Sequence, residues 1–325
     1  MTSFAELDSE NQINLLSAHA WAVLASYDIG TIESVESINH EFNSTFAVES
    51  ADGTRYALRI NVNSDRNLAN ANAEIEFINH LANATDLNFA TPIDKRDGSF
   101  VSCETFEPLG RAVVSVLFSW LEGEELGDEP TLEQLDQVGA AMAKMHEASL
   151  GLALSSTAEL PPLRDVLWLT ENLLTGPNAK LSGAAQSVVG LAIEQIDKAV
   201  AALYVRDSVR PIHADMHGWN LMWHDESLSV FDFDDSGLGL PIQDIFTAIY
   251  YLDTPEQDAA LLAGYASVRP VPQHSAFEKA ALLLQRRLIL LNYLFSTSTA
   301  EHRDMLPKYL EESLKRVDKF LSLSS

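Results

Sequence analysis

Cysteine is almost absent from this 325-residue sequence, which contains a single one, Cys103. One cysteine cannot form an internal disulfide, and it cannot build a cysteine-based zinc site. We expect Cys103 to be a small buried hydrophobic residue. The shortage of cysteine also fits a reducing compartment, so we expect a cytoplasmic protein.

Basic residues are scarce as well. Lysine and arginine number 21 against 47 acidic residues, which gives a formal net charge of −26. This acidity disfavours nucleic acids and anionic membranes as partners. It serves solubility, and it would also suit a cationic substrate. ATP is not excluded, because magnesium and local donor groups can neutralise its phosphates.

Long apolar runs are missing too. The most apolar late stretch, residues 280–295, is interrupted by Gln285-Arg286-Arg287 and is too short to span a bilayer. The first basic residue is Arg55, so a positively charged start of a signal peptide is lacking. We expect a soluble monomer or homodimer without a membrane partner. Arg286 and Arg287 are interpreted as a solvated or salt-bridged helix face; the alternative is that one binds an acidic substrate group.

The first third of the sequence predicts strands with few helices. Helical apolar spacing covers residues 8–25 and 69–82, whereas apolar and polar residues alternate over 35–38, 46–48 and 56–60. Asp52-Gly53 predicts a hairpin turn between the last two of these strands. Residues 113–118 are mostly apolar and predict a buried strand.

The remaining two thirds are predicted to be mainly helical, with one short β-rich segment at residues 221–233. Strands followed by helices indicate an α+β protein. The break at Leu121-Glu-Gly123 predicts two parts, residues 1–121 and 122–325. The predicted helices cover residues 132–146, 163–174, 184–204, 242–252, 255–266 and 276–295.

The β-rich segment carries a candidate metal site. Residues 221–223 predict a strand, 224–227 a turn and 228–231 a returning strand, with Asn220 before the first strand and Asp232 after the second. Such a hairpin brings Asn220 beside Asp232. Amide and carboxylate oxygens are ligands that magnesium accepts when phosphates and waters complete its octahedron.

Asp215, five residues before Asn220, is the candidate proton acceptor. Phosphoryl transfer needs an acceptor oxygen held in line, a base for its proton and cations on the phosphates. Protein kinases place His-Arg-Asp, then Asn, then Asp-Phe-Gly in this order, and the spacing from Asp to Asn is the same. Here Ala214 replaces the Arg and Asp234 replaces the Gly, and residues 235–244 are too few for an activation loop.

With these departures, the sequence resembles a family other than the protein kinases. His213-Ala-Asp-Met-His-Gly-Trp-Asn220 followed by Val230-Phe-Asp-Phe-Asp234 resembles the signature of the aminoglycoside phosphotransferase and choline kinase-like family. The resemblance implies a bilobal protein kinase-like fold, with an N-terminal antiparallel sheet lobe that contains one helix and a mainly helical C-terminal lobe. It extends over most of the chain and is loose over roughly the last 70 residues.

The resemblance implies roles for the matched residues. Asp215 would be the catalytic base, and Asn220 and Asp232 would hold Mg²⁺. The residues implied in ATP binding are Arg59 paired with Glu74, the hinge backbone around Val116 and Phe118, and Asn43 and Ser44 in a nucleotide loop without a glycine-rich pattern.

Five further residues near the motif have open or supporting roles. We interpret His213 as a brace of the loop and Asp244 as a buried anchor of its backbone. His217 would contact phosphate or substrate, or brace the loop. Asp234 would be either a second metal contact or a structural residue, and Trp219 would be a packing residue near the acceptor side.

The function implied is ATP- and Mg²⁺-dependent transfer of the γ-phosphate to a hydroxyl of a small molecule, such as an amino alcohol, an aminoglycoside or a homoserine-like amino acid. The alternatives are a protein Ser/Thr kinase of the stress-response type and an inactive nucleotide-binding pseudokinase. Asp232-Phe-Asp234 also resembles the Asp-x-Asp motif of haloacid dehalogenase-like phosphatases, but the lysine that such enzymes need downstream has no clear counterpart.

Overall fold

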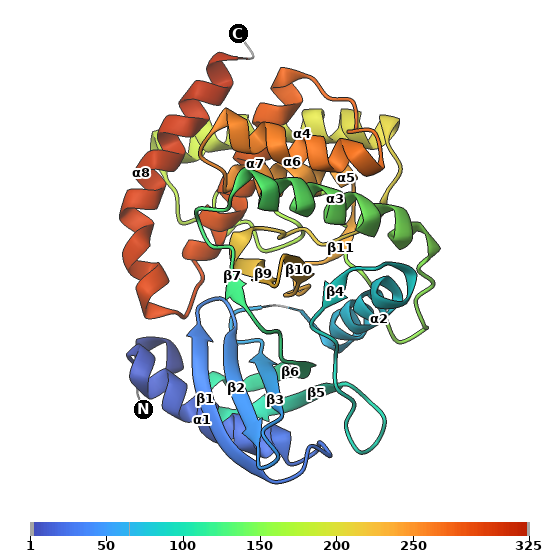
Figure 1. Cartoon of the computed structure of the whole chain (residues 1–325). Helices are drawn as coiled ribbons and strands as arrows, with labels where there is room; N and C mark the ends of the chain where they lie inside the picture. Colours follow the sequence, from blue (N-terminus) through green and yellow to red (C-terminus); the bar gives the residue numbers. More distant parts are fainter. Residues whose placement is uncertain (1–2, 65, 324–325) are drawn as a thin grey trace.

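A computed structural model describes residues 3–64 and 66–323. An antiparallel sheet, formed within the first 119 residues, lies at the lower end of Figure 1, and a larger helical part lies above it. A small β hairpin lies between the two, at the base of the helical part. This arrangement is the predicted α+β fold, with a sheet-rich N-terminal region and a helical C-terminal region.

The N-terminal sheet has five antiparallel strands in the order β1-β2-β3-β6-β5. Asp52-Gly53 forms the predicted turn, and Gly53 has the positive φ of +83° that favours glycine. The predicted buried strand is β6, which lies inside the sheet between β3 and β5. The bounds are β1 (Ile32–His40), β2 (Ser44–Ser50), β3 (Arg55–Ile60), β5 (Val101–Phe106) and β6 (Arg111–Ser119).

Two helices accompany this sheet. α1 (Ser9–Leu24) begins at Asp8, whose carboxylate accepts a hydrogen bond from the Asn11 backbone N at 2.9 Å. It shares a buried core with the sheet, including Leu16 and Leu58. α2 (Leu68–Ala84) instead turns its buried face, with Phe77 and Ile78, toward the core of the C-terminal part.

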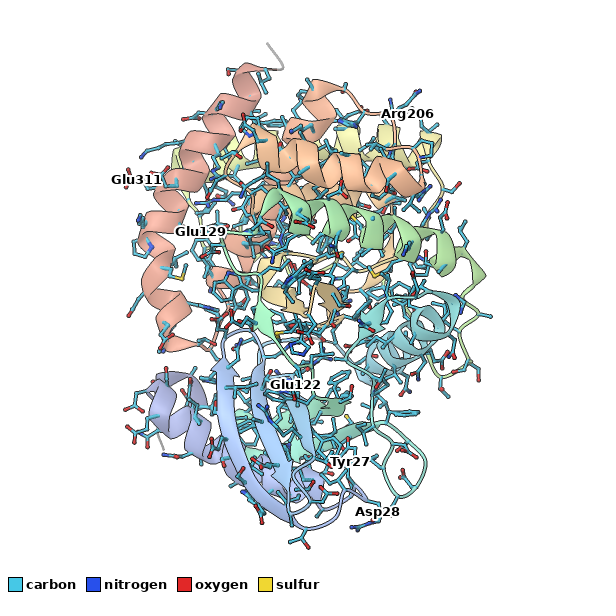
Figure 2. All side chains as sticks on the ribbon, in the orientation of Figure 1. Tyr27, Asp28, Glu122, Glu129, Arg206 and Glu311 are labelled. Carbon is cyan, nitrogen blue, oxygen red and sulfur yellow. The ribbon has the colours of Figure 1, made fainter. Side chains whose placement is uncertain are left out.

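Two short strands connect the N-terminal region to the central hairpin. β4 (Asn88–Phe89) runs parallel to β10 (Ser227–Val230), and β7 (Glu124–Glu125) runs antiparallel to β9 (Leu221–His224). Together they form a sheet in the order β4-β10-β9-β7. Glu122, labelled in Figure 2, lies where the chain passes from β6 to β7.

The C-terminal part packs its helices around one apolar core that continues to α2 and β5. Pro255 opens α6 after the capping residue Thr254, as the sequence predicts. A two-stranded sheet is formed by β8 (Arg210–Ile212) and β11 (Gly237–Gly239). The helices are α3 (Leu132–Ala148), α4 (Gly183–Arg206), α5 (Pro241–Tyr250), α6 (Pro255–Val268), α7 (Ala276–Leu294) and α8 (Ala300–Ser322). The last of these was not predicted from the sequence.

Two expectations about local structure were wrong. Residues 163–174 form turns instead of a helix, and Trp168 and Leu169 have positive φ values of 54° and 63°. The Asp165 side chain accepts hydrogen bonds from the backbone of Leu167 and Leu169, so it competes with helical pairing. Cys103 is exposed, because it lies on the outward face of β5.

No helix in the described part of the chain is both long enough and apolar enough to cross a membrane.

Candidate active site

The central hairpin brings Asn220 and Asp232 to the same end. Leu221 pairs with Val230, and the Phe231 backbone N donates to the Asn220 carbonyl at 3.2 Å. Asp232 follows directly with a positive φ of 58°, which turns its side chain out of the strand. Non-glycine residues in this conformation are strained and cluster at functional sites.

The loop before the hairpin is held by two buried polar residues. The Asp244 carboxylate accepts backbone N–H groups from His213 at 3.1 Å and Ala214 at 2.5 Å, and it also contacts His146 Nε2 at 2.8 Å. His213 contacts the Phe231 carbonyl through Nε2 and accepts from the Asp215 backbone N through Nδ1. Both side chains therefore fix the backbone on either side of Asp215.

Asp215 lies at the centre of a charged cluster. Its Oδ1 accepts a hydrogen bond from Arg286 Nη2 of α7 and lies 3.5 Å from His217 Nε2. Burial alone would raise the pKa of the Asp215 carboxyl. The Arg286 guanidinium and the His217 ring outweigh burial and hold this pKa well below its usual range. The side chain is therefore ionised at neutral pH.

Of the two forms expected for this pair, solvated or salt-bridged, Arg286 adopts the salt-bridged one, with Asp215 as its partner. Arg286 and Arg287 are 3% and 7% exposed. Arg287 donates to the Tyr309 carbonyl and the Ser313 hydroxyl, and so binds α7 to α8. Arg286, one position earlier in α7, instead contacts Asp215. The sequence places both arginines on one helix but carries no signal for which loop, 71 residues away, either one would meet.

On the N-terminal side, Arg59 of β3 organises a buried network. Its Nη1 and Nη2 donate to Glu74 of α2 at 2.8 and 2.6 Å, and Nη1 also donates to Asp232 at 2.9 Å. Burial would lower the pKa of Arg59, but Glu74, Asp234 and Asp232 raise it, so the guanidinium stays charged. Glu74, Arg59 and Asp232 thus link α2, the sheet and the hairpin.

Asn61 is a member of this network that sequence reasoning missed. It accepts from Arg59 Nε at 3.0 Å and donates to Asp234 Oδ1 at 2.7 Å. Asn43 donates to the other oxygen of Asp234 at 3.2 Å. A signal was available, because Asn61 lies two residues after Arg59 and therefore on the same face of the chain as it leaves β3. Asp234 itself is buried among these amides.

The turn between β1 and β2, residues 41–43, is anchored by distant side chains. Asn63 Nδ2 donates to the carbonyls of Glu41 and Phe42, and the Thr299 hydroxyl donates to the Glu41 carbonyl at 2.5 Å. Asn63 Oδ1 accepts from the Ser298 backbone N and hydroxyl. The α7–α8 connection therefore fixes this turn from the C-terminal side.

Two predicted nucleotide-binding residues of this turn are already engaged. Ser44 is fully buried, and its hydroxyl lies 2.7 Å from His40 Nδ1. Asn43 is buried against Asp234, while its Oδ1 has no hydrogen-bond partner among residues 3–64 and 66–323. Of these two residues, Asn43 is therefore the one with free capacity for a further contact.

The predicted hinge residues require a correction. Val116 pairs with Arg59 and Phe118 pairs with Ala57 along β3, so their backbone groups serve the sheet and are not free for adenine. The chain leaves the sheet after Ser119, and residues 120–122 form no backbone hydrogen bonds with other described residues. Free backbone groups in this region therefore begin after Ser119.

The oxygen donors at the hairpin base fit a magnesium ion. Asp232 supplies a carboxylate whose side chain is 35% exposed, and Asn220 supplies an amide. No group of three or more His, Cys, Asp or Glu side chains arranged to hold a metal occurs in the part of the chain that the structure describes. Magnesium is commonly bound by one or two protein oxygens, with phosphate and water as its other ligands.

A pocket lies beside the loop of residues 213–220, on the C-terminal side. Apolar residues form most of its walls, and it reaches His217 and Tyr251, whose rings lie 4.4 Å apart. Trp219 is 48% exposed at this pocket, and its Nε1 donates to Asp128 at 2.8 Å. The expectation that Trp219 is a packing residue is met only in part, because its Nε1 edge bonds Asp128 at the surface.

Comparisons with known proteins agree with this geometry. The sequence model of the phosphotransferase enzyme family matches residues 34–279. A search of curated protein sequences finds no match.

Solved structures share the fold at low identity. An amicoumacin kinase in complex with AMP-PNP, Ca²⁺ and Ami has a TM-score of 0.76 at 18% identity, covering 95% of this chain and 96% of its own. A microcompartment-associated aminopropanol kinase has a TM-score of 0.73 at 23% identity, with coverage of 94% and 97%. A spectinomycin phosphotransferase bound to ADP and spectinomycin has a TM-score of 0.59 at 13% identity, with coverage of 93% and 98%.

Proposed function

Because this chain belongs to the phosphotransferase enzyme family, we propose that it transfers the γ-phosphoryl group of ATP to a hydroxyl of a small molecule. The observation that carries this proposal is the convergence of three side chains: Asp215, Asn220 and Asp232 lie on one loop and hairpin, opposite the Arg59–Glu74 pair. A family match alone would leave the chemistry unassigned to residues.

In the proposed reaction, the acceptor hydroxyl approaches Asp215. The oxygen attacks the γ-phosphorus as the bond to the ADP oxygen breaks, and Asp215 takes the hydroxyl proton. Arg59, fixed by Glu74, places a permanent positive charge beside Asp232, where the phosphates would lie. Asp244 and His213 hold the loop backbone, which keeps the carboxylate of Asp215 in position.

Magnesium would be held by Asp232 and Asn220, and it would supply charge neutralisation at the phosphates. Adenine would meet the free backbone of residues 120–122. Among the predicted N-terminal residues, Asn43 and Arg59 would face the phosphates. We propose that the parts 1–121 and 122–325 serve as the nucleotide lobe and the acceptor lobe.

Short connections support a small acceptor over a protein. Only β11 separates Asp235 from the start of α5, so the chain has no room there for an activation loop. Kinases acting on aminopropanol, amicoumacin and spectinomycin share this fold. The complete set of base, metal and phosphate residues argues against an inactive pseudokinase.

The test is a screen for ATP consumption over amino alcohols, hydroxy amino acids, aminoglycosides and sugars, with product mass measured for each positive acceptor. We expect one acceptor class to gain a single phosphoryl group in the presence of Mg²⁺ and to lose turnover when the metal is chelated. Phosphorylation of a protein substrate alone, or binding of ATP without any transfer, would contradict the proposal.

A further inference from the structure

Arg286 forms an ion pair with the carboxylate of Asp215, which also lies 3.5 Å from His217 Nε2. Its Nε and Nη2 also donate to the Tyr251 hydroxyl, at 3.2 and 2.7 Å. The side chain is 4% exposed. A hydroxyl that reaches Asp215 would therefore lie beside a fixed, buried positive charge. Asp215 does not need this charge to accept a proton, so the charge calls for another explanation.

Arg286 also has unused donor capacity. A guanidinium carries five N–H groups, two of them on Nη1. Within residues 3–64 and 66–323, Nη1 donates no hydrogen bond, and it lies 3.9 Å from Asp235 Oδ2. The other two nitrogens are occupied by Asp215 and Tyr251. One edge of the guanidinium is thus left for an acceptor group that the described chain does not provide.

A second unused donor lies close by. The centre of the Trp168 ring is 5.9 Å from the Arg286 guanidinium carbon, and Trp168 belongs to one small apolar cluster with Ala214, the residue before Asp215. Trp168 is 8% exposed, and its Nε1 is buried without a hydrogen-bond partner among the described residues. Buried tryptophan N–H groups normally have partners. The backbone at Trp168 is strained, with φ of 54°, so the loop holds this ring at a cost.

These two observations point to the same kind of ligand. An unused guanidinium edge and an orphaned indole N–H both require an acceptor, and a carboxylate supplies two oxygens with a matching negative charge. A cationic group at the same place would be repelled by Arg286 and could not accept either hydrogen bond. This local chemistry opposes the cationic preference suggested by the net charge of −26.

Resting on the proposed function, we propose that Arg286 and Trp168 bind a carboxylate next to the reacting hydroxyl. The preferred acceptor is then a small hydroxy acid, a class that includes zwitterionic hydroxy amino acids. The amino alcohol that lacks the carboxylate is the poorer acceptor. Arg286 is then a specificity-determining residue that joins the base to the acceptor's acidic group. Asp235, which faces Arg286 from the β11 side, lies where it can contact an ammonium group of the same molecule.

The experiment compares acceptors that differ only in the carboxylate: homoserine against 3-aminopropanol, serine against ethanolamine, and threonine against 1-amino-2-propanol. We expect the wild type to show kcat/KM at least about tenfold higher for the carboxylated member of the best pair, the size of one charged hydrogen bond. Binding of the same pair, measured by calorimetry with a non-hydrolysable ATP analogue, should show the same preference without turnover.

Three variants make the test specific. Trp168→Phe removes the N–H and leaves a smaller aromatic ring in its place, so it should raise KM for the carboxylated acceptor more than KM for its decarboxylated partner. Arg286→Met should abolish the preference between the two members. Arg287→Met, one residue along α7 and turned toward α8, should keep the preference and serves as the matched control.

The outcomes separate the two claims. Three outcomes would overturn the carboxylate proposal without touching the kinase proposal. The wild type could prefer the amino alcohol, or its preference for the carboxylated acceptor could survive both Arg286→Met and Trp168→Phe. The enzyme could also bind Mg-ATP and turn over no carboxylated acceptor. Failure to bind Mg-ATP would overturn the proposed function itself. If Arg286→Met does not fold, Trp168→Phe and the wild-type pairs still decide the question.

Discussion

Single residues of the catalytic loop adopt conformations that sequence motifs do not report. Ala214 has φ of 69° and is completely buried, between two residues whose backbone contacts Asp244 and His213. The motif predicted which residues surround Asp215. It did not predict the partner of Asp215, because Arg286 comes from a helix 71 positions later and no local pattern links the two.

The strain at Ala214 gives a prediction at this scale. Ala214→Val should destabilise the fold by about 2 kcal/mol or more, because a β-branched side chain at positive φ is strained and the site has no spare volume. The free energy of unfolding of Ala214→Gly should be no more than about 1 kcal/mol below that of the wild type, and it can exceed it, since glycine adopts this conformation freely. Denaturant unfolding followed by circular dichroism measures both. Equal stability of the two variants would show that Ala214 is unstrained.

At the scale of elements, local periodicity predicted most strands and helices. It did not predict the hydrogen bonds by which distant residues hold these elements in place. Apolar alternation and turn residues identified β2, β3, β6, β9 and β10, because these signals lie within a few adjacent positions. The helix predicted over 163–174 failed, because side chains such as Asp165 bond the backbone locally. Asn63 and Ser298, which fix the β1–β2 turn, are 235 positions apart.

This anchoring of the β1–β2 turn can be tested through Asn63. Asn63→Ala removes its hydrogen bonds to Glu41, Phe42, Thr299 and Ser298. It should lower stability by about 1–3 kcal/mol. It should also raise KM for ATP more than KM for the acceptor, because the turn would face the phosphates.

The matched control is Asn83→Ala, since Asn83 is exposed and its side chain donates only to Asn79 one turn back in α2. Steady-state kinetics with each substrate varied in turn give both KM values. An ATP KM that stays at the wild-type value in Asn63→Ala would refute a positioning role for this anchor.

The whole molecule is acidic, and its largest apolar core joins the helical part to α2 and β5, while a second core lies between α1 and the N-terminal sheet. Its exposed acidic residues include Glu311, labelled on α8 in Figure 2, which pairs with Lys315 at 2.8 Å. Composition predicted this acidic exterior. It gave no account of the interior, where Arg59, Arg286 and Arg287 are all buried against specific partners.

Stability of the whole fold should depend on pH through His146, which bridges α3, α5 and α6 through Asp244 and the Tyr265 hydroxyl. Burial lowers the pKa of His146 below 6.5, against the pull of Asp244. The unfolded chain therefore takes up a proton as the pH falls below about 6.5, while the folded protein resists it. In that range, this difference at His146 should lower the free energy of unfolding by up to about 1.4 kcal/mol for each pH unit of acidification.

The check is the change in Tm between pH 7.5 and pH 5.5 in the wild type and in His146→Gln, which can still donate to Asp244. The wild type should lose more stability over this interval than the variant. An identical loss in both proteins would mean that His146 does not contribute to the acid sensitivity.

The central claim is that Asp215 is the base of a phosphoryl transfer from ATP to a hydroxyl. The most direct measurement is single-turnover transfer from γ-labelled ATP to the best acceptor of the screen, in the wild type and in Asp215→Asn, with Mg-ATP affinity measured in parallel. We predict a fall in transfer rate of about 10²–10⁴-fold with ATP affinity within a few-fold of the wild type. Transfer by Asp215→Asn within about tenfold of the wild-type rate would contradict the account.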